Sequence, residues 1–167
     1  MDPTRNPFPP GDPDRHAIWN MLVARDIDAF VAADWSMVAA DFVRAGFLGL
    51  HAMRSDRPDS WRIAFPTVEA YREEWLRQAR ETAATEFAEP LREAIFRATT
   101  LRDIDIDIAG ASAVARKKFD GTIRRADGGT DTLLWQTLYF CRRERGRWRI
   151  SGFVGYLPNP MGGARAA

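Results

Sequence analysis

The sequence predicts an α+β fold in which helices come first and an antiparallel sheet follows. In the first half of the chain, apolar residues recur every three or four positions, the spacing of one helix face. After Pro90 the apolar period changes to two, the spacing of one strand face. Because the two patterns form separate blocks, a doubly wound parallel sheet is excluded. We expect three helices in the N-terminal half, packed against a cone-shaped, curved antiparallel sheet of four to six strands.

Composition excludes several classes of protein. The chain has 167 residues, the usual size of one domain, with 24 Lys and Arg against 23 Asp and Glu. A net charge of +1 gives no basic field for nucleic acid. Cys141 is the single cysteine, so neither an internal disulfide nor a thiolate metal site is expected. No apolar stretch is long enough to span a membrane, and the N-terminus lacks the apolar core of a signal peptide. We therefore expect a cytoplasmic protein without nucleic-acid, membrane or metal partners.

The distribution of proline and glycine predicts one domain between two extended ends. Residues 1–13 are rich in proline and are expected to form an extended arm. Residues 14–158 carry the periodic patterns and form the domain. Residues 159–167 contain further proline and glycine and are expected to be a flexible tail.

Each expected helix begins at a recognisable start signal. Asp12 precedes Pro13 and an apolar stripe that continues to Asp34, so a helix of about 20 residues is predicted. Asp34 is placed to cap a second, short helix from Trp35 to about Phe42. A third helix is expected from Pro66 and Thr67 onward, ending before Pro90 because proline cannot continue it.

The remaining segments predict the sheet. Val43–Met53 suits a short strand, and Ser55–Phe65 is polar and suits a loop. Asp103–Ile108 alternates strictly between acidic and apolar residues, and Arg116 and Lys118 on the next strand can neutralise the acids. Turn residues separate the long segments, which implies an antiparallel meander. Those segments are Ala113–Arg125, Thr130–Arg143 and Trp148–Leu157.

A long, twisted sheet capped by helices forms a cone with a hollow mouth. The chain has six Trp, ten Phe and three Tyr, enough for aromatic walls around such a cavity, although a bulky core is the simpler use of them. Residues 132–142 are expected to form a strand, and bulky apolar side chains occur on both of its faces. A sheet that is apolar on both faces normally covers something on each. We therefore expect a homodimer formed through the outer face of the sheet.

Five segments carry a resemblance to a known family: Trp19–Phe30, Asp34–Trp35, Ala40–Phe42, Val68–Phe87 and Trp148–Pro158. Together they resemble the nuclear transport factor 2-like superfamily, which includes the SnoaL-like and ketosteroid-isomerase-like proteins. The resemblance spans most of the chain and implies the cone fold, but the superfamily contains both enzymes and non-catalytic domains. Its isomerases carry a carboxylate near the end of the first strand and a tyrosine in the first helix. This chain has His51 at the first position and no tyrosine in that helix.

Three residues are candidates for proton transfer. His51 lies in an apolar strand near the expected mouth of the cone and titrates near neutral pH, unless it is simply a half-buried histidine bonded to the backbone. Asp41 would form an acid–base pair with His51 if the fold brings them together, or else closes a turn. Tyr71, on the third helix, would supply one hydroxyl or pack in the core.

Five further residues are candidates for ligand contacts. Four are aromatic and are expected on the cavity wall or in the core: Trp35, Trp75, Trp135 and Tyr139. Arg97 lies in an apolar segment that we expect to be a strand. A guanidinium pointing inward there would need an acid or an anionic ligand, and one pointing outward would not.

These observations leave two functions open. The first is an enzyme without a cofactor, an isomerase, cyclase or lyase that moves a proton on a small, apolar, cyclic substrate. The second is a non-catalytic ligand-binding or assembly domain. Both imply a small-molecule ligand or a filled cavity, and the sequence does not decide whether the protein is an enzyme.

Overall fold

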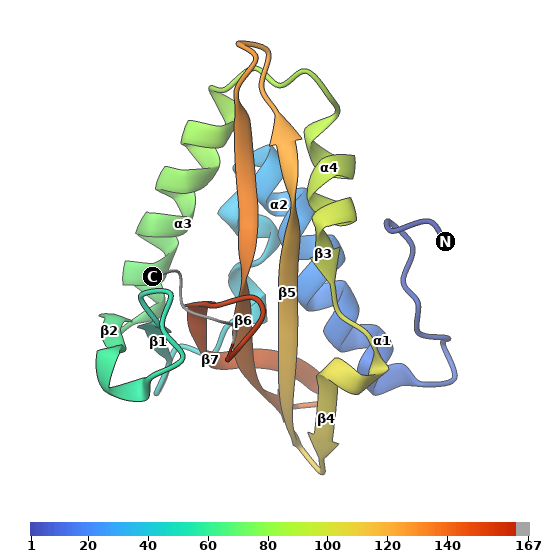
Figure 1. Cartoon of the computed structure of the whole chain (residues 1–167). Coiled ribbons are helices and arrows are strands. Elements are labelled where there is room, and N and C mark those ends of the chain that lie inside the picture. The colour runs from blue at the N-terminus through green and yellow to red at the C-terminus, as the bar shows by residue number, and fades with distance from the viewer. Residues whose placement is uncertain (163–167) are drawn as a thin grey trace.

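The computed structural model describes residues 1–162 and consists of helices packed on the concave side of a strongly curled sheet (Figure 1). The helices come mainly from the first half of the chain, and the long strands come from the second half. The α+β cone predicted from the sequence is thereby confirmed.

The first helical segment runs without a break from Pro13 to Ala32. It comprises α1 (Pro13–Trp19), the π-helical turn η1 (Asn20–Arg25) and α2 (Asp26–Ala32). The Asp12 side chain accepts a hydrogen bond from the backbone N–H of Arg15, which confirms the predicted cap. Ala33 ends the segment in the left-handed conformation, with φ of 50°.

The predicted second and third helices are also present. The short one is divided into two 3₁₀ turns, η2 (Trp35–Met37) and η3 (Ala39–Asp41), and Asp34 caps the first of them. The long one is α3 (Val68–Ala83), capped by the Thr67 side chain, which accepts from the N–H of Ala70 at 3.2 Å. It ends seven residues before Pro90.

A fourth helix, α4 (Leu91–Ala98), corrects the prediction that Arg97 lies in a strand. Its buried residues Ala94, Ile95 and Ala98 follow Leu91 at offsets of three, four and seven, which is helical spacing. Arg97 is on the outer side of this helix, where its guanidinium pairs with Glu89 at 2.7 Å. An expectation based on strand alternation thus fails because Pro90 starts a helix rather than ending one.

The sheet has seven strands in the order β2-β1-β7-β6-β5-β3, and β4 pairs with β5 beside β3. All neighbours are antiparallel except β1 and β7, which are parallel. The sheet is therefore mixed, and it is larger than the four to six antiparallel strands expected. One extra strand, β2, forms inside the segment expected to be a loop. The strands are β1 (Leu48–His51), β2 (Arg62–Phe65), β3 (Thr99–Thr100), β4 (Ile106–Ala109), β5 (Ser112–Arg124), β6 (Thr130–Glu144) and β7 (Arg147–Leu157).

The acidic alternation after Asp103 begins as a 3₁₀ turn, η5 (Asp103–Asp105), and not as a strand. The carboxylate of Asp105 is buried, accepts from the N–H of Arg102 at 2.9 Å, and pairs with Lys118 at 2.7 Å. This local bond holds the turn, so the strand starts only at Ile106. The predicted neutralisation is confirmed, since Arg116 also pairs with Asp107.

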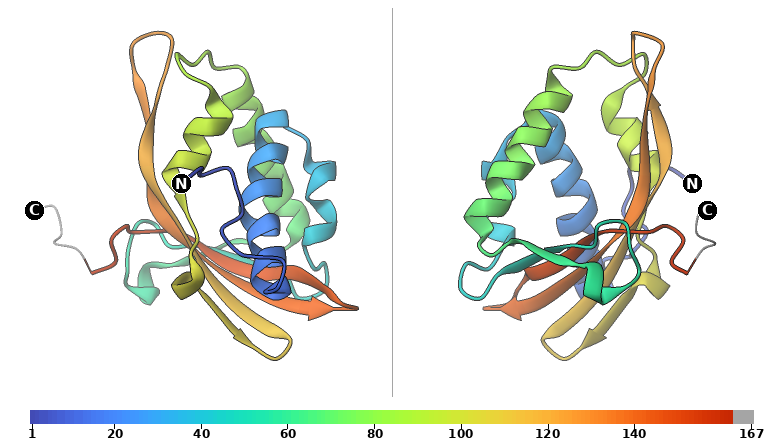
Figure 2. Two further views of the ribbon diagram at one scale, coloured as in Figure 1. Left: turned by 90° about the vertical axis from the view of Figure 1, so that its right-hand side faces the viewer. Right: turned by 60° about the vertical axis from the view of Figure 1, so that its left-hand side comes forward.

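The curl of the sheet creates the space for a site. The upper part of the β5–β6 hairpin stands beside α3 and α4, while β7 and β1 pass beneath the helices (Figures 1 and 2). The segment between α3 and α4 pairs with the hairpin through a bridge between Phe87 and Arg125. Helices and sheet are therefore joined at the narrow upper end.

Residues near the beginning and the end of the described chain contact this body. Within the predicted arm, Phe8 is buried and the amide of Asn6 donates to the carbonyl of His16 at 3.0 Å. Asn159 donates to the carbonyl of Phe119 at 2.9 Å. Residues 163–167 of the predicted tail lie outside the described residues. None of the helices described is both long and apolar enough to cross a membrane.

Candidate functional site

A cavity of about 170 Å³ lies between the helices and the concave face of the sheet. A cavity of about 150 Å³ is enough for one benzene ring, so this space holds a single small ring. Its walls are mainly apolar and aromatic, as is usual for small-molecule sites. They include Ile27, Phe30 and Trp75 from the helices and Phe119, Trp135 and Phe153 from the strands.

One ion pair lies in this apolar wall. The ammonium of Lys117, whose side chain is only 1 % exposed, donates to Oδ2 of Asp26 at 2.8 Å and to the carbonyl of Leu22 at 2.5 Å. It also lies 5.0 Å from the centre of the Phe119 ring. The Asp26 side chain is 30 % exposed, and its second oxygen, Oδ1, has no hydrogen-bond partner within residues 1–162. The carboxylate thus keeps one oxygen for a ligand.

Local structure explains why these two groups meet. On β5 the inward positions alternate as Ala115, Lys117 and Phe119, so the pleat directs Lys117 toward the helices. Asp26 is the first residue after the π-helical turn η1, and the Leu22 carbonyl within that turn accepts from Lys117. Single π-helical turns often occur at functional sites.

Two tyrosine hydroxyls complete the polar part of the cavity. Tyr71 and Tyr139 both line it, and neither hydroxyl has a hydrogen-bond partner in the part of the chain that the structure describes. Burial raises the pKa of Tyr71 well above its ordinary value, and the nearby Asp26 carboxylate adds to the effect. Burial likewise raises the pKa of Tyr139, with contributions from Tyr71 and Asp26. Both phenols stay protonated at neutral pH and can donate to a ligand.

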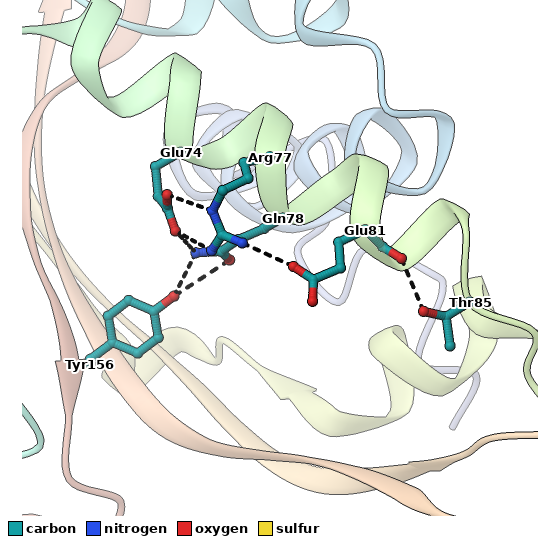
Figure 3. Close-up of polar contacts among 6 residues, drawn as sticks. All are labelled: Glu74, Arg77, Gln78, Glu81, Thr85 and Tyr156. Carbon is teal, nitrogen blue, oxygen red and sulfur yellow. Dashed lines mark hydrogen bonds and ion pairs between the residues drawn. The ribbon is translucent and has the colours of Figure 1, made fainter. Parts of the chain in front are cut away.

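Tyr156 forms part of the cavity wall in a strained conformation. Its φ of 55° is unusual for a residue other than glycine. Gln78 Nε2 donates to the Tyr156 hydroxyl at 3.1 Å and to Glu74 at 3.0 Å (Figure 3). Arg77 in turn binds Glu74, and this hydrogen bond lowers the pKa of Glu74 to about 2. A network of side chains from α3 thus holds the tyrosine ring against the cavity.

His51 is placed behind this tyrosine and is not among the residues that line the cavity. Its imidazole stacks on the Tyr156 ring, with the centroids 4.4 Å apart. The backbone N–H of Met53 donates to His51 Nδ1 at 2.9 Å. The structure therefore gives His51 a direct contact with Tyr156 and none with the cavity space.

We expect His51 to titrate below pH 6.5 in the folded protein. Burial lowers its pKa, and the positive charge of Arg54 adds to this. Because the folded pKa is lower than the unfolded one, the stabilising contribution is present above pH 6.5 and is lost as pH falls. A proton NMR titration measures the midpoint, and Arg54→Gln should raise it. A midpoint at or above 6.5 in the wild type would contradict this environment.

The carboxylate of Asp41 forms ion pairs with two arginines. Its carboxylate is 1 % exposed and accepts two hydrogen bonds from Arg25, at 2.7 and 2.8 Å, and one from Arg147 at 2.7 Å. The expected pairing of Asp41 with His51 is not formed, because each group has other partners. Asp41 joins the first helical segment to β7 at the base of the helix layer.

Of the five residues expected to contact a ligand, three line the cavity and two do not. Trp75, Trp135 and Tyr139 line the cavity together with Tyr71. Trp35 is not among the lining residues and packs behind them, stacked on Phe42 at 5.1 Å and edge-on to Trp75 at 5.3 Å. Arg97 is not among the residues that line this cavity.

Sequence reasoning missed the ion pair of Asp26 and Lys117. Two signals could have revealed it. Lys117 falls on the apolar set of its strand, and Asp26 interrupts the stripe that includes Trp19, Leu22 and Phe30. A charge inside an apolar periodic face needs a partner when buried, so each residue implied the other.

Comparisons with known proteins locate the fold but no activity. No family model matches the chain, and no curated protein matches it. Several solved structures are similar to this chain. One is a protein from Novosphingobium aromaticivorans that is provisionally named a scytalone dehydratase. It has a TM-score of 0.55 and 17 % sequence identity, and the match covers 87 % of this chain and 84 % of that chain. A protein of unknown function from Mycobacterium tuberculosis has a TM-score of 0.55 and 17 % identity, with 90 % and 76 % covered. A nuclear transport factor 2-like protein of unknown function from Shewanella baltica has a TM-score of 0.52 and 14 % identity, with 86 % and 92 % covered. At these identities the likeness concerns the fold alone.

Proposed function

We propose that this chain, which has the nuclear transport factor 2-like fold, binds a small cyclic molecule in its cavity and moves a proton on it, with Asp26 as the base. The observation that carries the proposal is the free Oδ1 of Asp26 within an otherwise aromatic cavity. A carboxylate with an unpaired oxygen, facing apolar walls and protonated phenols, is suited to general base catalysis.

The proposed step uses only groups of this chain. Asp26 Oδ1 removes a proton from a ring carbon next to a carbonyl, and the C–H electron pair becomes the C=C bond of an enolate. Tyr71 or Tyr139 donates a hydrogen bond to the enolate oxygen, where the negative charge accumulates. When the ring carries a C=C bond beside that carbon, return of the proton to the far end of this bond moves the double bond and completes an isomerisation. Lys117 holds Oδ2 and so fixes the direction of Oδ1.

Isotope exchange tests this proposal without knowledge of the natural substrate. In D₂O, the wild-type protein should exchange the α-hydrogens of cyclohexanone faster than buffer does, as followed by proton NMR. Thr137→Phe fills the cavity from its wall and should abolish the acceleration and the binding. Thr122→Phe makes the same substitution at an exposed position of β5 and should keep both.

The outcomes separate the two classes of function. Exchange that disappears in Thr137→Phe and persists in Thr122→Phe supports the enzyme. Binding of cyclohexanone without any exchange supports the alternative, a ligand-binding domain without catalysis. If neither binding nor exchange occurs, the cavity is a structural void and the proposal is wrong.

We also propose that a second copy of this chain covers the outer face of the sheet. Leu133, Trp135, Thr137 and Tyr139 line the cavity, so alternation directs the residues between them to the opposite face. On that face Leu50, Trp61 and Leu138 pack against a small cluster of buried side chains, Ala52, Val154 and Leu157, and further apolar side chains are exposed. The exposed members include Leu48, Leu134 and Phe140, each about 40 % exposed.

Substitution of a charged residue on this face should dissociate the dimer. We expect light scattering to give twice the chain mass for the wild type and the chain mass for Phe140→Glu, because the glutamate would be buried without a partner. Ile104→Glu places the same charge on an exposed side chain of η5 and should leave the dimer intact. A monomeric wild type would contradict the proposal.

A further inference from the structure

A second, more open groove of about 560 Å³ adjoins the cavity described above. Five side chains line both spaces, so the two spaces meet at these residues. The groove runs between the end of α3, the start of α4 and the inner face of the upper β5–β6 hairpin, the region where these elements stand side by side in Figures 1 and 2. The shared side chains are Phe30, Gln78, Ile95, Leu133 and Trp135.

The length of the groove follows from its walls. Along α3 the groove extends from Gln78 to Thr82, which is about 6 Å at 1.5 Å per residue, and it continues to Thr85 beyond the end of the helix. Along β6 it extends from Trp135 to Asp131, about 13 Å at 3.3 Å per residue. The inner cavity alone holds one ring. A ligand that uses both spaces therefore has a ring and an arm.

The charges on the walls select the chemistry of the arm. The two spaces are lined by five carboxylates and two cations. Both cations are already paired, Lys117 with Asp26 and Arg125 with Asp127 and Asp131. Behind the wall, Arg77 pairs with Glu74 and Glu81 (Figure 3). With Arg77 included, the carboxylates still exceed the cations by two. The five carboxylates are Asp26, Glu74, Glu81, Asp127 and Asp131.

We propose that the ligand is a ring carrying an arm that ends in a protonated amine, with the ring in the inner cavity and the arm in the outer groove. This rests on the proposed binding function and specifies its substrate class. The apolar floor of the groove, which includes Phe87, Leu91 and Ile123, contacts the chain of the arm. Its acidic rim attracts the amine and repels a carboxylate or phosphate of the same length.

Four probes measured by calorimetry test this proposal. Toluene carries only the ring, and 6-phenylhexylamine, 6-phenylhexanol and 6-phenylhexanoic acid add arms of one length with different charges. We expect the amine to bind at least ten-fold more tightly than toluene and three- to ten-fold more tightly than the acid. The preference over the acid should shrink at high salt, because exposed charges are screened.

Matched variants test the groove that holds the arm separately from the cavity that holds the ring. Glu81→Gln with Asp127→Asn should reduce the preference for the amine over the acid, and both residues lie on the groove. Glu73→Gln removes an exposed carboxylate on α3 that lines neither space and should change nothing. Thr82→Trp narrows the groove and should weaken all three armed probes while toluene binding persists.

The possible failures are distinct. If toluene and the armed probes bind equally, the arm site does not exist, although the ring site stands. If the acid binds as tightly as the amine or more tightly, the assignment of the amine is wrong. If no probe binds, the proposed binding function itself is wrong, and the proposed substrate class is wrong as well.

Discussion

Asp26→Asn is expected to slow cyclohexanone exchange by a hundred-fold to ten thousand-fold, the usual contribution of a general base. Asparagine retains an oxygen that can accept from Lys117 and has nearly the same shape, so the cavity is preserved. It cannot take up a proton at neutral pH, however. The rate constant measured by NMR should therefore fall, with little change in the affinity for the ketone.

A matched control exists on the same helix. Asp28 lies two residues further along α2 and pairs with Arg92 at 2.6 Å without lining the cavity. Asp28→Asn should leave exchange unchanged. If Asp26→Asn folds normally and still exchanges at the wild-type rate, Asp26 is not the base.

The ion pair also makes Asp26 important for the stability of the protein. The free energy of unfolding is therefore measured together with the rate of exchange. Asp26→Ala leaves the buried Lys117 charge without its partner, and breaking a buried pair in this way costs about 3–5 kcal/mol. Lys117→Met removes that charge and should recover much of this loss when combined with Asp26→Ala. Urea denaturation of the two single variants and the double variant measures the coupling between them.

Asp41→Ala is expected to lower the free energy of unfolding by about 3 kcal/mol. The substitution removes three charge-assisted hydrogen bonds and leaves Arg25 and Arg147 facing a small void. Because these arginines are 37 % and 47 % exposed, water can still solvate them, so the cost falls at the lower end of the range for buried pairs. Urea denaturation measures the change.

The same variant tests whether Asp41 is catalytic. Exchange per folded molecule should equal that of the wild type, because its carboxylate is fully engaged by arginines. Asp107→Ala removes an exposed carboxylate paired with Arg116 and should cost less than 1 kcal/mol. A fully folded Asp41→Ala protein that has lost exchange would restore Asp41 as a catalytic candidate.

The helices and long strands were predictable because their signals are local. Asp12, Asp34 and Thr67 cap helices where the sequence places them, and the last three strands begin and end within two residues of their predicted bounds. The sequence is less informative where a local hydrogen bond overrides the alternation of apolar and polar residues. Asp105 bonds to the N–H of Arg102, and this turns an alternating segment into a 3₁₀ turn.

The candidate site was predictable only in part. Tyr71, Trp75, Trp135 and Tyr139 line the cavity because the periodic patterns place them on the inner faces of α3 and β6. The contact made by His51 could not be foreseen, since its imidazole stacks on the ring of Tyr156, a cavity residue with a left-handed backbone. No periodicity in the sequence encodes that backbone conformation.

The π-helical turn Asn20–Arg25 fixes the rotational phase of the helix that follows it. Each residue of a regular α-helix advances by about 100°, so a wide turn resets which residues face the sheet. If the same six residues formed a regular α-helix, Asp26 would be rotated by about 100° relative to Trp19 and would point away from Lys117. The direction of the carboxylate thus depends on the wide turn that precedes it as well as on its identity.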